Sequence, residues 1–268
     1  MPMNAINLLQ VPQTTSETSD TPPAARRLPS TAQTSTPTLV LCELRAASEI
    51  GLESHSPFCL KIHRSLRAAG LAYTSRHGSR PSVFSKLNPR AQVPVLLVDG
   101  QPIVDSSAIL SYIVDARPGT ISATAEEWLM EDWADTSLNG FLVASRWADD
   151  RNWDRVRQAY FAEAPWFVRT LVAPMLRRKV VSTLVARDVW RGGAEACWTS
   201  FERTLDRLDT RVRRHAFFSG PRLSVADLAI FGQLHSLRTE LTPWQRDAVL
   251  ARPGLSRYLD HVNEATAV

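Results

Sequence analysis

The hydrophobic pattern divides the chain into two parts of different character. In the first, residues 38–44 (TLVLCEL) form a mainly apolar run that predicts a buried strand. Residues 71–76 predict a second strand. Residues 93–98 and 101–104 flank an Asp-Gly pair at 99–100, which favours a tight hairpin between two further strands.

Helices are expected between these strands and after them. The first begins with Ser56 as N-cap and Pro57 at the first helical position, and it ends at Gly70. Another begins near Asp105 and Ser106. The order strand, helix, strand, loop, strand, strand, helix predicts a small α/β domain with a mixed sheet.

Strand signals disappear from about residue 122 onward. Apolar residues then recur at helical spacing, as in residues 201–212, and all eight tryptophans lie in this part. We expect five to seven helices and place the boundary at the Arg-Pro-Gly cluster of residues 117–119. The prediction is an α/β domain at residues 38–117, followed by an all-helical domain at residues 118–268.

The first 37 residues differ from both parts. They are rich in Thr, Ser, Pro, Gln and Ala and show no apolar periodicity. Such a segment buries too little apolar surface to offset the entropy lost on ordering. Residues 1–37 are therefore predicted to be a disordered tail.

Composition narrows the class of protein. The 268 residues carry a formal net charge of +4, and three cysteines are too few for a disulfide scaffold, which favours a cytoplasmic location. No apolar run approaches the roughly 18 residues of a membrane span, so none is expected. Basic clusters at residues 177–179 and 211–214 alternate with apolar residues, and we interpret them as solvated helix faces. We therefore expect no nucleic-acid partner.

Three segments could carry chemistry. The sequence from Ser56 to Lys61 (SPFCLK) starts a helix, where free N–H groups and a partial positive charge favour an anion such as a thiolate. In the segment NPRAQVPVL, Pro94 opens a strand, which indicates an edge, a bulge or a cis turn. Asp105 and Ser106 could present another helix N-terminus to a carboxylate. Taken singly, the two helix starts are better explained by ordinary capping, and the residues alone favour the trans form of Pro94.

Taken together, these segments resemble the cytosolic glutathione transferase superfamily. The resemblance continues at residues 217–227 (FFSGPRLSVAD), which is similar to the folding signature of that superfamily. There Ser224 and Asp227 predict a capping box. The match covers about residue 38 to the C-terminus and implies a thioredoxin-like N-terminal domain followed by the superfamily's all-α C-terminal domain. The SPFCLK helix start most resembles the metaxin and failed-axon-connections-like branch.

The resemblance implies a role for each residue of the site. The hydroxyl of Ser56 would donate a hydrogen bond to the glutathione thiolate. The backbone of Val93 would pair with the cysteinyl group, exposed by a cis Pro94, and Gln92 would lie near the glycine end. The acidic-Ser pair Asp105 and Ser106 would hold the γ-glutamyl group.

Some residues depart from the superfamily pattern. The loop at residues 45–55 is longer than in the well-studied classes, and Asp105 replaces the more common Glu. Ser56 occupies the position of the cysteine in omega-type transferases, and a serine cannot form a mixed disulfide. We therefore favour Cys59 as a packed core residue over a redox residue.

The leading hypothesis is a transferase that conjugates glutathione, as co-substrate and without a metal, to a small hydrophobic electrophile. A homodimer is implied by the resemblance. Four residues of the helical part are candidates for the electrophile site, although packing in the core is the favoured interpretation: Trp128, Leu129, Trp133 and Phe141. Two alternatives stay open, a non-catalytic metaxin-like module that binds a protein and a Cys59-dependent thiol reductase.

Overall fold

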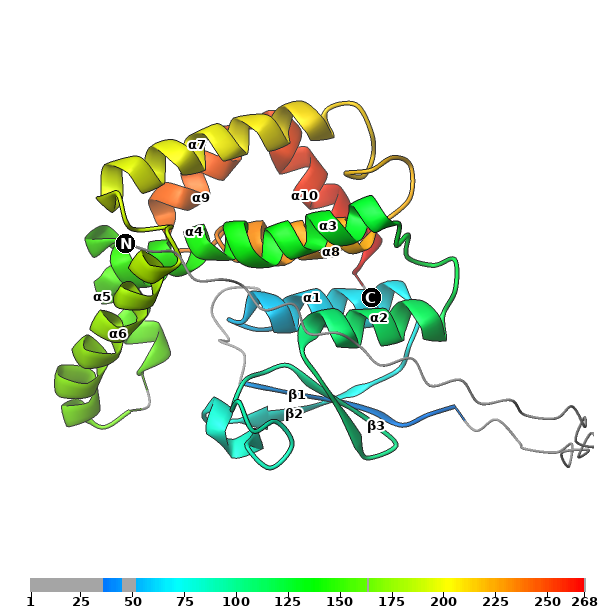
Figure 1. The fold of residues 1–268 in the computed structure, drawn as a ribbon, viewed down its shortest axis with the longest axis horizontal. Helices are drawn as coiled ribbons and strands as arrows, with labels where there is room; N and C mark the ends of the chain where they lie inside the picture. Colours follow the sequence, from blue (N-terminus) through cyan, green and yellow to red (C-terminus); the bar gives the residue numbers. More distant parts are fainter. Residues whose placement is uncertain (1–35, 45–51, 163, 268) are drawn as a thin grey trace, which may run out of the picture. The chain divides into compact units, whose positions relative to one another are not determined.

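The computed structural model describes residues 36–44, 52–162 and 164–267. The predicted disordered tail lies almost entirely outside the described residues, as does most of the loop at residues 45–55. Figure 1 shows the arrangement of the described elements.

Four strands form one mixed sheet in the order β2-β1-β3-β4. The order of strands and helices in this part is as predicted, with β1 (Leu39–Leu44) parallel to β2 (Thr74–Gly78) and antiparallel to β3 (Val95–Val98). β3 and β4 (Gln101–Val104) form the expected hairpin. Asp99 and Gly100 both have positive φ angles, of 49° and 83°, as the tight Asp-Gly turn requires.

The second strand begins later than predicted. We expected it from residue 71, but Leu71 is buried beneath the end of the first helix, and its N–H donates to the carbonyl of Leu66. Gly70 adopts a φ of 62°, and this left-handed residue closes the helix. The chain becomes extended only after this cap is complete, so β2 starts at Thr74. A short 3₁₀ helix, η1 (Pro81–Phe84), then precedes β3 and had not been predicted.

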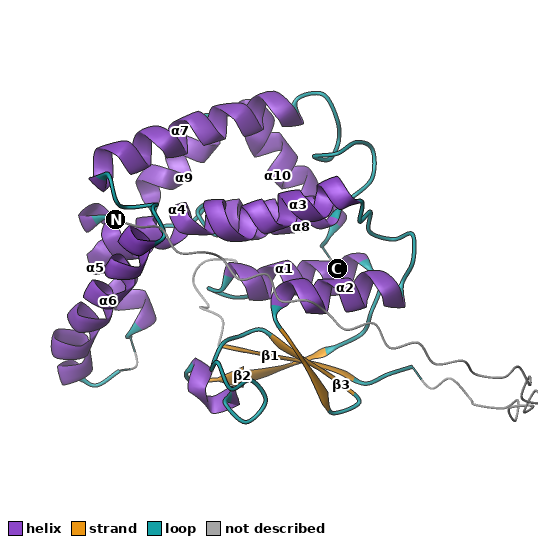
Figure 2. Cartoon of the chain, in the orientation of Figure 1, coloured by secondary structure: helices purple, strands orange, loops and turns teal. Residues whose placement is uncertain are grey.

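Two helices cover one face of the sheet. Figure 2 shows α1 (Pro57–Ala68) and α2 (Ser106–Ala116) between the strands and the helical part. The predicted apolar face of α1 is confirmed, since Cys59, Ile62 and Leu66 are fully buried. The opposite side of α1 is also buried, because it packs against α8 (Val225–His235) of the helical part.

The rest of the chain is helical. α3 (Ala125–Trp133), η2 (Ala134–Leu138), α4 (Asn139–Val143) and η3 (Ala144–Ala148) follow one another without a break, the η segments having π-helical geometry. Further helices are α5 (Asp150–Tyr160), α6 (Ala173–Ala186) with the π segment η4 (Val168–Val172) before it, α7 (Gly193–Val212), α8, α9 (Pro243–Leu250) and α10 (Pro253–Ala265). Counted as continuous segments, the described residues of this part contain seven helices, within the five to seven predicted. None of these described helices is long and apolar enough to cross a bilayer.

α8 is the centre of the core and fixes the position of α1. Every residue of α8 from Val225 to Leu234 is buried. At Gly232 a Cβ would lie 2.7 Å from the carbonyl oxygen of Pro57, so only a glycine lets the first turn of α1 rest on α8. The predicted capping box at Ser224 and Asp227 is confirmed and starts this helix.

Candidate functional site

The sheet register brings three segments to one edge. Val95 pairs with Cys42 near the end of β1 and with Val104 at the end of β4. Residues just before β3 and just after β4 therefore lie side by side there. Because α1 connects two parallel strands, it begins at the same edge, beyond the end of β1. The structure thus gathers the start of α1, the segment before β3 and the start of α2 at one edge.

Ser56 is the N-cap of α1. Its Oγ accepts a hydrogen bond of 3.4 Å from the backbone N–H of Cys59, and its side chain is partly exposed. Its own N–H donates to Oγ of Ser54 at 3.3 Å. In this arrangement the Ser56 oxygen caps the helix, while its hydroxyl can donate a hydrogen bond to an anion outside the helix.

Cys59 lies one turn into α1 and is fully buried. Burial raises the pKa of its thiol to about 12, against a smaller opposing effect of the Ser56 hydroxyl. The thiol is therefore protonated at neutral pH and unsuited to nucleophilic attack. The structure gives no support to the thiol reductase alternative.

The segment before β3 is held by a buried side chain. Nδ2 of Asn88 donates to the carbonyl of Gln92 at 3.0 Å, and its Oδ1 accepts from the N–H of Arg90 at 3.1 Å. The Val93–Pro94 peptide bond is cis, the form that the resemblance implied. Gln92 is exposed and Val93 partly exposed. The sequence motif contains Asn88, but its role in shaping this turn had not been foreseen.

The start of α2 is capped by Asp105. Its Oδ1 accepts from the N–H groups of Ser107, at 2.9 Å, and Ala108, at 3.3 Å. Asp105 has a φ of 81°, a left-handed conformation that turns the chain sharply from β4 into the helix. Ser106 follows as a buried residue at the first helical position.

An arginine of the helical part reaches the residue before Ser56. Nη1 of Arg146 donates to the carbonyl of His55 at 2.7 Å and to the hydroxyl of Tyr160 at 2.9 Å, and Nη2 donates to the carbonyl of Ser236 at 2.9 Å. Burial, together with the Arg146 charge, lowers the pKa of His55 to about 4, so this histidine is neutral. Arg146 was missed by the sequence analysis, because a contact between distant segments leaves no local pattern.

A buried ionic network joins α1 and the first turn of α2 to α3 and η2. Nζ of Lys61, on α1, is 2.5 Å from both Oε1 of Glu131 and Oδ2 of Asp135. Oγ of Ser107 donates to the same Glu131 oxygen at 2.7 Å, and Nε2 of Gln233 donates to Oδ1 of Asp135 at 3.4 Å. Lys61 therefore connects α1 and the first turn of α2 to the helical part.

Asp135 makes this network sensitive to pH. Burial, reinforced by the Glu131 charge and opposed by that of Lys61, raises the pKa of Asp135 to about 6. An aspartate in an unfolded chain has a pKa of about 4, so the folded state binds this proton more tightly. The resulting stabilisation is complete below about pH 4 and is lost as the pH rises through about 6. We expect this group to lower the free energy of unfolding by on the order of 2–3 kcal/mol across that range.

Urea unfolding at a series of pH values measures this effect. Replacing Asp135 by Asn should remove the loss between about pH 4 and pH 7, because the amide does not titrate. Asp132→Asn is the matched control, since Asp132 is exposed one turn earlier on α3, and it should leave the profile unchanged. An Asp135→Asn profile parallel to that of the native chain would contradict the prediction.

The electrophile-site candidates do not form one surface. Phe141 is buried in the core against Phe201, with ring centroids 5.4 Å apart. Trp128 and Trp133 are partly buried against the same core, whereas Leu129 is exposed. Packing therefore accounts for three of the four.

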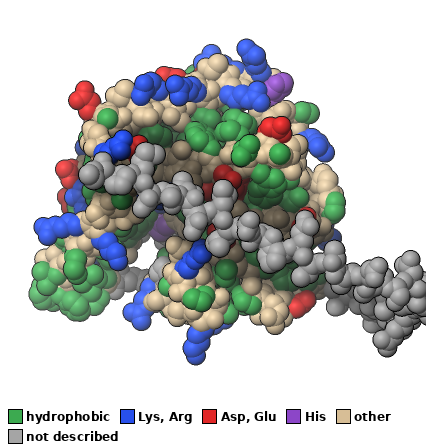
Figure 3. All heavy atoms as spheres, in the orientation of Figure 1, with side chains coloured by type: hydrophobic (Ala, Val, Ile, Leu, Met, Phe, Trp, Pro, Cys, Tyr) green, Lys and Arg blue, Asp and Glu red, His purple; other side chains and the backbone are tan. Residues whose placement is uncertain are grey.

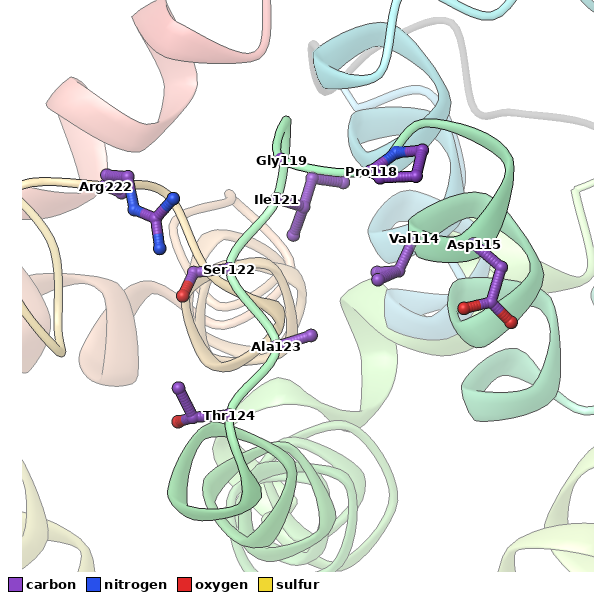
Figure 4. A pocket seen from close by; sticks show the side chains of 9 residues that line it. All are labelled: Val114, Asp115, Pro118, Gly119, Ile121, Ser122, Ala123, Thr124 and Arg222. Atoms are coloured by element: carbon purple, nitrogen blue, oxygen red, sulfur yellow. The ribbon is translucent and has the colours of Figure 1, made fainter.

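A pocket of about 400 Å³ lies at the opposite end of α2. Figure 4 shows it between Val114 and Asp115 on α2, the linker at residues 118–124, and Arg222. Its nearest residue on α2, Val114, lies eight positions after Ser106, or about 12 Å along the helix at about 1.5 Å per residue. This pocket is therefore separate from the edge that holds Ser56. Among the described residues, no group of His, Cys, Asp and Glu side chains is placed to hold a metal ion.

Comparison with known proteins places this geometry in a family. Residues 55–116 match the family model described as glutathione S-transferase, N-terminal domain, and residues 191–261 match the glutathione S-transferase C-terminal domain. The two matches include both helix starts, the cis proline and the capping box of α8.

Solved structures share the fold at low sequence identity. The β-etherase LigF from Sphingobium sp. strain SYK-6 is 23% identical, with 84% of this chain and 95% of that chain covered and a TM-score of 0.57. A glutathione transferase family member from Pseudomonas fluorescens, solved with two glutathione molecules bound, is 16% identical, with 88% and 94% covered and a TM-score of 0.56. A glutathione transferase from Burkholderia graminis, also with two glutathione molecules bound per subunit, is 20% identical, with 85% and 87% covered and a TM-score of 0.53. The metaxin-like branch stays a prediction. Both domain families match this chain, the N-terminal one before the C-terminal one, and the chain belongs to the glutathione S-transferase superfamily.

Proposed function

We propose that this protein is a glutathione transferase in which Ser56 assists ionisation of the glutathione thiol. The observation that carries the proposal is the partly exposed Ser56 hydroxyl at the N-terminus of α1, at the sheet edge where the cis Val93–Pro94 bond and the start of α2 also lie. The sulfur anion would then meet a hydroxyl donor and a helix terminus together.

The Ser56 hydroxyl and the N-terminus of α1 can together lower the pKa of the glutathione thiol enough for ionisation at neutral pH. A free thiol of this kind has a pKa of about 8.5. A charge-assisted hydrogen bond and the helix terminus together contribute on the order of 2–4 kcal/mol to the anion. At about 1.36 kcal/mol per pKa unit, this lowers the thiol pKa by roughly two units, which makes the thiolate abundant at neutral pH.

The reaction follows from the bound thiolate. Its sulfur lone pair forms the new bond to the electrophilic carbon, the leaving group departs with its bonding electrons, and the thiol proton has already passed to solvent. The protein contributes ionisation and orientation.

The remaining candidates would hold the tripeptide. Val93 would pair through its backbone with the cysteinyl group, Gln92 would lie near the glycine carboxylate, and Asp105 with Ser106 would bind the γ-glutamyl group. Because Oδ1 of Asp105 already caps α2, its other carboxylate oxygen would receive the ligand ammonium. We assign glutathione binding to residues 38–117 and a small hydrophobic electrophile to the helical residues 118–268.

Calorimetric titration with glutathione tests the proposal directly. We expect binding with a dissociation constant in the millimolar range or below. No heat of binding at millimolar glutathione would remove the enzyme hypothesis. Burial of Ser56 would favour the non-catalytic alternative, whereas the part of the chain that the structure describes leaves Ser56 partly exposed.

Replacing Ser56 by alanine should lower kcat by about 10–100-fold with little change in glutathione affinity, because the hydroxyl acts on the anion and not on the bound thiol. Ultraviolet titration of the bound thiolate should show its pKa rising toward about 8.5 in this variant. Cys59→Ala is the control and should leave this titration unchanged. A Ser56→Ala enzyme with native kcat would refute the role of this hydroxyl.

A further inference from the structure

The segment at residues 166–176 exposes an unusual amount of apolar surface. Trp166 is 71% exposed, Leu171 66% and Met175 64%. Together with their neighbours these residues form one surface, called here the α6 patch: Trp166, Phe167, Leu171, Val172, Met175 and Leu176. Figure 3 shows apolar side chains gathered over η4 and α6 at the lower left of the molecule.

α6, which carries part of the patch, has few buried residues. Along α6 only Ala173 and Leu184 are buried. Arg177 fixes the helix from one side by donating to the carbonyl of Trp147 at 2.7 Å and by pairing with Asp150 at 2.6 Å. Among the described residues, no comparable contact covers the outer side of η4 and α6, where the apolar side chains are exposed. Exposed apolar surfaces of this kind generally mark an interaction site.

The positive charge around the α6 patch favours an anionic partner. Between Glu163 and Asp188 the sequence contains five cationic side chains and no Asp or Glu, and one of the five, Arg177, is paired with Asp150: Arg169, Arg177, Arg178, Lys179 and Arg187. Arg169, Arg178 and Lys179 are exposed beside the apolar residues. An exposed helix with Trp, Phe and Leu on its outer surface, cations beside them and no acidic residue has the composition of helices that lie in a membrane interface.

We propose that the α6 patch docks on an anionic lipid surface. The apolar side chains would enter the boundary between headgroups and acyl chains, with Trp166 at headgroup depth, while the cations contact the anionic headgroups. The helix would lie in the interface without crossing the bilayer.

A second copy of the chain fits this surface less well. A two-fold contact would place the patch against its own copy, so the basic clusters of both chains would face one another. Like charges at such a contact oppose association, whereas a surface of anionic lipid neutralises them. The charge of the segment therefore favours the lipid surface.

Sedimentation of the full chain with vesicles tests this docking. We expect binding to vesicles of phosphatidylcholine and phosphatidylserine, weaker binding to phosphatidylcholine alone, and a fall in binding as salt shortens the screening length. The double variant Leu171→Glu, Met175→Glu should reduce the bound fraction at least about tenfold, because it places charge where apolar groups must enter the interface. Both residues are exposed, so the fold is retained.

Two further variants separate the contribution of the apolar side chains from that of the cations. Leu129→Glu is the matched control, since Leu129 is 68% exposed on α3 outside the patch, and it should bind as the native chain does. Replacing Arg178 and Lys179 by Glu should abolish the preference for phosphatidylserine. Equal binding by the native chain and the Leu171→Glu, Met175→Glu variant would overturn the proposal. Failure of the native chain to bind phosphatidylserine vesicles would also overturn it. If light scattering then showed that the Leu171→Glu, Met175→Glu variant converts a dimer to a monomer, the patch would be assigned to a second copy.

Discussion

Replacing Lys61 by methionine is expected to lower the free energy of unfolding by about 3–5 kcal/mol at neutral pH. The Lys61 ammonium is the cation between Glu131 and Asp135, and both Lys61 and Glu131 are almost completely buried. Methionine fills the same space but leaves two carboxylates facing each other without a counter-charge. Urea unfolding followed by circular dichroism measures the loss.

Two controls separate charge from packing. Lys86→Met removes an exposed lysine and should change stability by less than about 0.5 kcal/mol. Combining Lys61→Met with Glu131→Gln and Asp135→Asn should recover most of the loss, because no uncompensated charge is then buried. If Lys61→Met alone were as stable as the native chain, the three groups would not act as an ionic network.

This network also links stability to the proposed site. Glu131 accepts the hydroxyl of Ser107, which directly follows Ser106 in the first turn of α2. The same turn would receive the γ-glutamyl group of glutathione. A change that displaces Glu131 would therefore disturb the turn that we propose binds the γ-glutamyl group.

Local chemistry explains why much of the fold could be predicted from the sequence. The Asp-Gly turn, the Ser-Pro helix start and the capping box at Ser224 each depend on residues within four positions of one another. The start of β2 was misplaced for a reason of the same kind. Leu71 has the character of a strand residue, but it completes the helix cap by bonding to Leu66.

The parts that could not be predicted depend on distant segments. A lysine at position 61 would ordinarily be assigned to a solvated helix face, and only the packing of the helical part on α1 buries it, with Glu131 and Asp135 beside its ammonium. Arg146 contacts His55 from 91 positions away in the sequence. For Pro94, the residues alone favoured the trans form, and the cis form was implied by the resemblance and found in the structure. The contacts of Lys61 and Arg146 depend on how the α/β part packs against the helical part, which local sequence patterns do not specify.

The second large effect is expected at Asp227, where replacement by alanine should lower the free energy of unfolding by about 4–5 kcal/mol. Its Oδ1 accepts from the N–H of Phe218 and the hydroxyl of Tyr258, both at 2.7 Å, and its Oδ2 accepts from the N–H of Ser224 at 2.8 Å and from that residue's hydroxyl. Alanine would leave four donors without this acceptor in the interior. Since α8 supports the first turn of α1, the loss of its cap should also lower the yield of folded protein.

The second capping box of the chain provides the matched comparison. At the start of α3, Oε2 of Glu127 accepts from the N–H of Thr124 at 2.7 Å and from the hydroxyl of Ser122 at 2.9 Å. Glu127 is itself buried, but Thr124 is exposed and Ser122 partly exposed. Replacing Glu127 by alanine removes two hydrogen bonds whose donors can turn to water, so this variant should lose only about 1–2 kcal/mol. Urea unfolding of both variants side by side measures the difference. Equal losses would show that the cost at Asp227 comes from helix capping alone, whereas a larger loss at Asp227 assigns it to the buried donors that this single carboxylate holds together.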